Sequence, residues 1–134
     1  MNAEAIKTLL IQTQTRMLEL VDSLSDAQRD IPYHPGINPP VWEMGHAAFF
    51  FEWFILKGRD GRTTFARRLD DVWDSFQLAH QDRWSTNLFP DYRATRHYSQ
   101  HVHAQIVERL ERLPLTPEDL YLYRYAAYHQ NMHI

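Results

Sequence analysis

The chain has 134 residues, enough for one domain, and its 44% hydrophobic content is sufficient for a single core. Its formal net charge is −3 and its basic residues are dispersed, so no Lys/Arg block predicts binding to nucleic acid or to an anionic membrane. The lack of cysteine excludes disulfides, thiolate metal ligands and a cysteine nucleophile. Neither a signal peptide nor a membrane-spanning apolar stretch is recognisable, which predicts a cytoplasmic protein.

Hydrophobic spacing predicts a first amphipathic helix over residues 3–24, whose apolar residues recur at three- and four-residue steps. Ser25 with Gln28 three residues later is a capping-box pattern for a short helical turn. A proline-rich loop over 31–40 follows.

A second helix is predicted from the Pro39-Pro40 pair to about Lys57, because proline is tolerated in a first helical turn. The apolar stripe of this helix consists of Trp42, His46, Phe49, Phe50, Trp53 and Leu56. Beyond it the signal is weaker: residues 69–76 fit a short helix, and 77–91 are predicted to form an ordered loop.

The third helix is predicted to begin near Thr95 and to end before Pro114. A fourth helix follows, with Thr116 as its N-cap and Pro117 at its first position, and it runs to the end of the chain. No segment alternates like a strand. Four helices with one long connection between the second and the third predict an all-α bundle.

Three histidines of these helices are candidate metal ligands. His129 and His133 are four residues apart, so they share a helix face, and they continue the apolar row of Leu122 and Ala126. Spacing alone fits two structural histidines equally well. His46 lies on the inward stripe of the second helix, and bundle metal sites are built from facing helices, so His46, His129 and His133 are predicted to form one site.

Three neutral imidazoles without a thiolate suit Zn, Fe or Ni, and they leave coordination positions open for a substrate or oxygen. Such a site is catalytic in type, and spacing does not choose the metal. A metalloprotease is excluded, because Gln130 occupies the position at which HExxH places its general base.

Other histidines fit this site less well. His97 and His101 are also four residues apart, with His103 nearby, but they lie off the apolar row of the third helix. They are predicted to lie on a solvated face or at a subunit contact. His34 and His80 lie in loop segments and carry no pattern.

Three segments together resemble a known family: 40–46 (PVWEMGH), 50–53 (FFEW) and the closing His129-x-x-x-His133. In order and spacing they are similar to the N-terminal DinB-like domain of the ergothioneine-biosynthesis-type non-haem iron sulfoxide synthases, which include related selenoneine synthases. The resemblance covers essentially the whole chain.

This resemblance implies that His46, His129 and His133 bind Fe(II). Members of the family use Fe(II) and O₂ to join a sulfur or selenium donor to the imidazole of hercynine or histidine. Arg83 lies where the family places arginines that meet the carboxylates of the donor; the alternative is a solvent-exposed arginine. Glu52 is either an acceptor for a ligand imidazole N–H or, the preferred interpretation, a carboxylate on the helix surface.

The resemblance further implies that residues 1–134 are the N-terminal part of a two-domain enzyme whose second domain resembles the formylglycine-generating enzyme. The Glu that the family places two residues after His133 lies beyond the chain. The isolated chain is therefore predicted to bind metal weakly and not to turn over. The donor (γ-glutamylcysteine, cysteine or a selenosugar) and the oligomeric state stay open.

Two alternatives remain. One is a stand-alone DinB-like metal-dependent thiol transferase or hydrolase that uses Zn or Ni. The other is a helical interaction domain whose histidines are structural.

Overall fold

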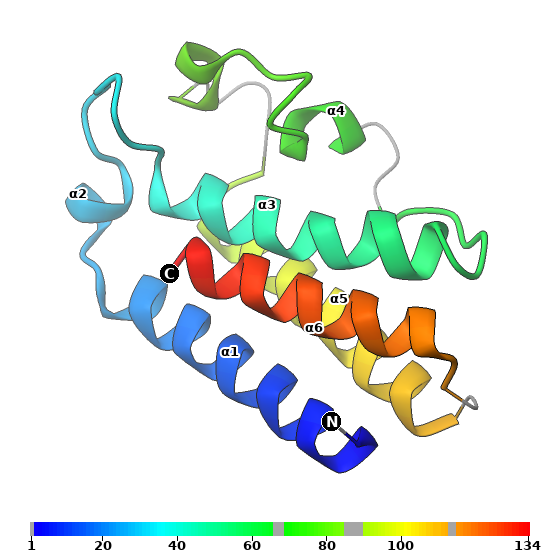
Figure 1. Cartoon of the computed structure of the whole chain (residues 1–134). Coiled ribbons are helices and arrows are strands. Elements are labelled where there is room, and N and C mark those ends of the chain that lie inside the picture. Colours follow the sequence, from blue (N-terminus) through cyan, green and yellow to red (C-terminus); the bar gives the residue numbers. More distant parts are fainter. Residues whose placement is uncertain (1, 66–68, 85–89, 113–114) are drawn as a thin grey trace.

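The computed structural model describes residues 2–65, 69–84, 90–112 and 115–134. Within these ranges the regular structure is helical and no strand occurs, which confirms the predicted all-α class. Four long helices lie side by side (Figure 1): α1 (Ala3–Ser23), α3 (Pro40–Phe51), α5 (Tyr92–Arg112) and α6 (Pro117–Met132). The C-terminal end of α6 lies at the same end of the molecule as the beginning of α3.

Four short elements complete the described structure: α2 (Asp26–Arg29), the π-helix η1 (Glu52–Lys57), α4 (Asp70–Trp73) and the 3₁₀-helix η3 (His80–Trp84). The second predicted helix thus reaches Lys57, but its last six residues are π-helical. The segment from α4 to η3 forms an outer layer over α3 (Figure 1). Residues 85–89 of the predicted loop over 77–91 lie outside the described residues. Within the rest, the prediction is wrong for η3. This helix carries no apolar periodicity, and long-range bonds such as that from Trp84 Nε1 to the Ile31 carbonyl (2.8 Å) hold it in place.

Local sequence explains where the helices begin. The Asn2 side chain accepts the Ala5 amide at the start of α1. Ser25 forms the predicted capping box with Gln28, and Thr116 forms a second box with Asp119 ahead of Pro117 in α6. These caps fix the register of α6, which carries two of the three candidate ligands.

The core is built from apolar side chains of all four long helices. Its largest fully buried members include Trp42, Tyr123, Ile6, Leu10, Met17, Met44, Ile55 and Ile106. This core holds α3 and α6 against each other and thereby sets the distance between the candidate ligands.

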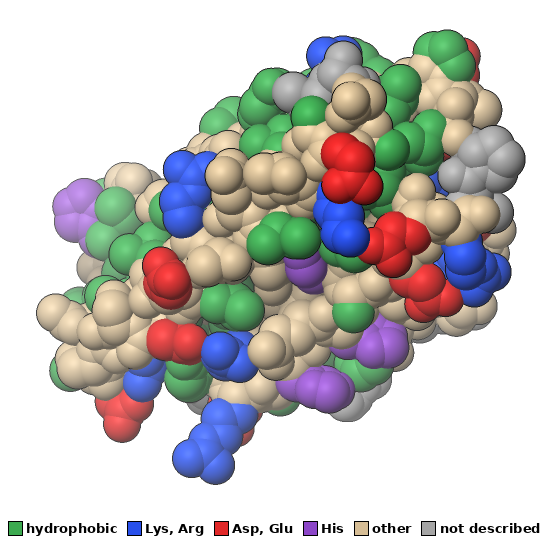
Figure 2. Space-filling view, turned by 90° about the horizontal axis from the view of Figure 1, so that it is seen from below, with side chains coloured by type: hydrophobic (Ala, Val, Ile, Leu, Met, Phe, Trp, Pro, Cys, Tyr) green, Lys and Arg blue, Asp and Glu red, His purple; other side chains and the backbone are tan. Residues whose placement is uncertain are grey.

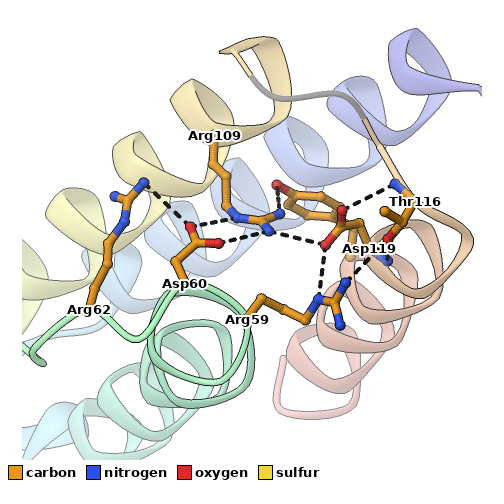
Figure 3. Close-up of polar contacts among 7 residues, drawn as sticks. Arg59, Asp60, Arg62, Arg109, Thr116 and Asp119 are labelled. Carbon is orange, nitrogen blue, oxygen red and sulfur yellow. Dashed lines mark hydrogen bonds and ion pairs between the residues drawn. The ribbon is translucent and has the colours of Figure 1, made fainter.

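A charged network closes the end of the helices where α6 begins (Figure 3). The buried Arg109 guanidinium donates through Nε and Nη2 to both oxygens of Asp60 (2.8 and 3.0 Å). It also donates to Asp119 Oδ1 (3.1 Å) and to the Tyr123 hydroxyl (2.9 Å). Arg59 adds a second cation on Asp119 (3.2 Å). The loop after η1 is thus tied to α5 and α6.

Acidic and basic side chains lie next to one another on the face seen from below (Figure 2). No described helix combines the length and apolar character needed to cross a membrane.

Candidate metal centre

The structure brings His46, His129 and His133 together. One ring nitrogen from each lies within 4.8 Å of the other two. The Nε2 atoms of His129 and His133 are 3.2 Å apart. The middle of α3 supplies His46. His129 lies in the last turn of α6 and His133 is the C-cap residue of that helix, as the apolar rows of the two helices predict.

Hydrogen bonds set the tautomers of two of the rings. His46 Nδ1–H donates to the Trp73 carbonyl (2.7 Å), which can only accept. His133 Nδ1 is bonded to the Glu43 carboxylate. In both rings the Nε2 lone pair is left for another partner. A ligand imidazole is commonly oriented in this way by a bond from its other nitrogen.

The third ring is held by packing. His129 stacks on Phe50, with ring centroids 4.0 Å apart, and Phe50 in turn stacks on Tyr125. His129 Nδ1 is buried and has no hydrogen-bond partner among the described residues.

Burial keeps the His46 and His129 rings uncharged. Burial, together with the neighbouring His133 and His46 rings, lowers the pKa of His129 to about 3. The pKa of His46 is also lowered, again mainly by burial. A neutral imidazole is the form that binds a metal ion, so no proton has to be lost from these rings near neutral pH.

The distances fit a common ion. Two nitrogens that bind one ion at about 2.0–2.1 Å, at an angle of about 90–110°, lie about 2.9–3.4 Å apart. The 3.2 Å between Nε2 of His129 and Nε2 of His133 falls in this range. With three neutral nitrogen donors and no thiolate, the cluster suits Zn, Fe or Ni.

The outer layer packs closely on α3 beside His46. A Cβ atom on Gly45 would lie 2.3 Å from the Trp73 ring, so only glycine allows α4 to approach this closely. Trp42 Nε1 donates to the Val72 carbonyl (3.0 Å), and its indole stacks on the His46 ring at 4.7 Å. The carbonyl that orients His46 is therefore itself held in place by α3.

Glu43 is the functional residue that sequence reasoning missed. It precedes His46 by three residues on α3, and both its oxygens are used: Oε2 by His133 Nδ1 and Oε1 by Asn38 Nδ2 (2.8 Å). Burial favours the neutral carboxyl, but these hydrogen bonds outweigh it and lower the pKa of Glu43. Its position one turn before His46 is the signal that could have found it.

Arg83 is half-buried, which rules out the fully exposed alternative. Its guanidinium lies 4.2 Å from the Trp42 ring centroid. Nη1 donates to Asn38 Oδ1 (2.9 Å), and Nη2 donates to the Ser75 and Leu78 carbonyls (3.1 and 3.3 Å). Nε is buried without an acceptor among the described residues. Arg83 also lines a cavity of about 270 Å³.

Both interpretations of Glu52 are wrong. Glu52 is only 3% exposed, so it is not a surface carboxylate. Its oxygens accept from the Tyr98 hydroxyl (2.8 Å) and the Phe65 amide (2.7 Å). The acceptors for the candidate ligands His46 and His133 are Trp73 and Glu43. Burial raises the pKa of Glu52.

The remaining histidines lie outside the cluster. His97 is exposed, and His101 packs against Phe65 with centroids 4.5 Å apart. Burial lowers the pKa of His103 to about 4. In the loops, His34 Nδ1 accepts the Gly36 amide, and His80 Nε2 donates to the Ile37 carbonyl (2.6 Å).

A cavity of about 420 Å³ opens beside the cluster. Asn38, Glu43 and His133 are its polar lining residues, and Met17 and Met132 are among its apolar ones. The cluster is thus next to a space that a small molecule can enter.

The fold and the cluster define an all-helical protein with three converging imidazoles that could hold a metal ion. Residues 9–134 match the DinB superfamily, and the chain belongs to this superfamily. It is also similar to proteins named hercynine oxygenase. The one from Mycolicibacterium smegmatis is 30% identical over 134 residues, covering 97% of this chain and 30% of that protein.

Two further proteins named hercynine oxygenase match this chain to a similar extent. The protein from Mycolicibacterium thermoresistibile is 27% identical over 126 residues, and that from Mycobacterium tuberculosis is 26% identical over 132 residues. The matches cover 92% and 97% of this chain and 28% and 30% of the two relatives. The chain therefore spans about three tenths of the length of these relatives.

Proposed function

We propose that this chain is the iron-binding domain of an O₂-dependent enzyme that joins a sulfur or selenium donor to the imidazole of hercynine or histidine. His46, His129 and His133 are the ligands in this proposal, and the architecture is a DinB-like four-helix bundle with a long connection between its second and third helices. The observation that carries the proposal is the convergence of three imidazole nitrogens within 4.8 Å, in a chain similar along almost its whole length to hercynine oxygenases.

Each ligand has a support of its own. The Trp73 carbonyl holds His46 through Nδ1, the Glu43 carboxylate holds His133 through Nδ1, and Phe50 stacks on His129. A bound Fe(II) ion would supply the oxygen chemistry, which three imidazoles allow because they leave coordination positions free. The residues of this chain position the three histidines, and burial keeps His46 and His129 neutral.

Substrates would approach from the side of the cavity beside Glu43 and His133. The contact of Arg83 with a donor carboxylate stays a prediction. Three of its five N–H groups donate to Asn38, Ser75 and Leu78, so Nε–H or the second N–H of Nη1 would make the contact. A second domain resembling the formylglycine-generating enzyme would complete the substrate pocket, and the relatives' greater length supports that expectation.

One observation favours a second candidate. Three neutral imidazoles bind Zn or Ni as readily as Fe, so a stand-alone DinB-like thiol transferase or hydrolase uses the same cluster. The two candidates differ in the metal that the protein retains and in the need for O₂.

The test begins with metal binding. The chain is titrated anaerobically with Fe(II), and with Zn(II) for comparison, beside His46→Ala and His129→Ala. Both variants are expected to lose binding. Unchanged metal content in both would remove the ligand assignment.

The reaction is tested on the protein encoded by the natural gene. With Fe(II), O₂, hercynine or histidine and a thiol or selenol donor, a product with a new C–S or C–Se bond is expected. Hydrolysis or thiol transfer without O₂ consumption would favour the second candidate instead.

A further inference from the structure

We propose that Arg83 is a positioning residue of the metal centre, acting through Asn38 and Glu43 to fix which nitrogen of His133 faces the metal. This inference rests on the proposed three-histidine metal site and goes beyond it. It gives Arg83 a function in holding the ligands, distinct from contact with a substrate.

The first step is a chain of hydrogen bonds from Arg83 to His133. Arg83 Nη1 donates to Asn38 Oδ1 (2.9 Å), and Asn38 Nδ2 donates to Glu43 Oε1 (2.8 Å). The other oxygen of Glu43 is bonded to His133 Nδ1. These bonds link four side chains, which come from the loop before α3, from α3 itself, from η3 and from the end of α6.

The direction of this chain follows from the chemistry of its ends. A guanidinium can only donate, so it fixes the Asn38 amide with its oxygen toward Arg83 and its NH₂ toward Glu43. An NH₂ group facing Glu43 favours the ionised carboxylate, which can only accept. His133 must then donate from Nδ1, and its Nε2 lone pair is left toward His129, 3.2 Å away.

Arg83 supports the other side of the centre as well. Its guanidinium lies over Trp42, whose indole stacks on the His46 ring with an angle of 8° between the planes. Its Nη2 atom binds the carbonyls of Ser75 and Leu78, within the outer layer that follows α4. One planar side chain thus joins the outer layer directly to α3, and through Asn38 and Glu43 to the end of α6. A lysine lacks the flat, forked donor set that this requires.

The two functions for Arg83 predict different measurements. A residue that only contacts the donor leaves metal affinity unchanged and raises the KM for the donor. A positioning residue alters metal affinity and the tautomer of His133 before any substrate is added.

The test uses the 134-residue chain with Co(II) as a spectroscopic probe. Arg83→Met and Asn38→Ala are each expected to weaken Co(II) binding about tenfold, the lower end of the range for partners that orient metal ligands. The double variant should be no weaker than the weaker single variant, because both changes break one chain. Arg112→Met removes an exposed arginine of α5 and serves as the control, with affinity within about twofold of wild type.

The tautomer is measured in the metal-free protein from the side-chain ¹⁵N shifts of His133. Wild type is expected to carry the proton on Nδ1, and both Arg83→Met and Asn38→Ala should gain a population with the proton on Nε2. A purely structural role lowers the melting temperature without this change. Affinity and tautomer equal to those of Arg112→Met would overturn the proposal.

A wrong ligand assignment would give a different result from a wrong role for Arg83. In that case wild type and His129→Ala bind Co(II) equally or not at all. The His133 tautomer then still decides the role of Arg83, because its measurement needs no metal.

Discussion

Two polar clusters lie at opposite ends of α6 and differ in the hydrogen-bonding groups that they leave without a partner. At the beginning of α6, Arg109 is surrounded by Asp60, Asp119 and Tyr123, so its donors are used within the protein (Figure 3). At the other end, His129 has a buried Nδ1 without a described partner, and its Nε2 faces that of His133. The charged cluster is closed and stabilises the fold, whereas the histidine cluster keeps lone pairs available for a ligand.

The largest expected effect is the loss of stability when the charged cluster around Arg109 is broken. Arg109→Leu leaves Asp60 and Asp119 without their shared cation in a buried setting, and the free energy of unfolding should fall by about 3 kcal/mol. Urea denaturation measures this. Arg112→Leu, which breaks an exposed pair with Glu108, should cost less than about 1 kcal/mol. Equal effects of the two variants would contradict the contrast between the clusters.

A change in the histidine cluster should affect metal affinity strongly and stability little. His129→Leu removes a proposed ligand, and Co(II) affinity should fall more than about 100-fold, since even the partners that orient ligands are worth 10–100-fold. The free energy of unfolding of the metal-free chain should change by less than about 1 kcal/mol, because the lost imidazole is uncharged and has an unsatisfied nitrogen. A loss as large as that of Arg109→Leu would show that His129 is structural.

A smaller effect is expected for the carboxylate behind His133. Glu43→Gln keeps the shape of the side chain but removes its charge, and Co(II) affinity should fall about tenfold. Glu108→Gln changes an exposed glutamate on α5 and serves as the matched control. Affinities that agree within twofold would mean that the charge of Glu43 does not contribute.

The last comparison separates the two clusters by the pH at which each begins to lose stability. His129 and His46 have lowered pKa values in the folded chain, so below the ordinary histidine pKa of about 6.5 the unfolded state binds protons that the folded state does not. Stability should therefore begin to fall between pH 7 and 5. Asp60 and Asp119 also have lowered pKa values, and their contribution is lost only below about pH 4.

Urea denaturation of the metal-free chain at pH 7, 5, 4 and 3 checks this order. His129→Leu should flatten the decline between pH 7 and 5 and leave the decline below pH 4 in place. An unchanged slope between pH 7 and 5 would mean that His129 does not contribute to it.

Local patterns predicted the helices and the faces that carry the three histidines. Thr116 and Pro117 begin α6 as predicted, and periodicity placed His129 and His133 toward the bundle interior, where they meet His46. Such patterns are properties of consecutive residues, so a single sequence displays them.

The supports of the ligands were not predictable in the same way. The acceptor for His46 is a backbone carbonyl of Trp73, which no side-chain pattern encodes. Glu52 was misplaced because its burial depends on Tyr98, 46 residues later in the chain. These contacts form only after distant segments have packed, and spacing within one helix says nothing about them.

Glu43 and His133 are bonded although 90 residues separate them in the chain. The candidate metal centre therefore exists only after α3 and α6 have docked, and an unfolded chain presents no comparable set of ligands. By mass action, an ion at 100 times its dissociation constant would add about 2.7 kcal/mol to the free energy of unfolding. Metal binding at this centre would thus stabilise contacts between segments that are far apart in the sequence. The rise in melting temperature on adding metal would serve as a binding assay.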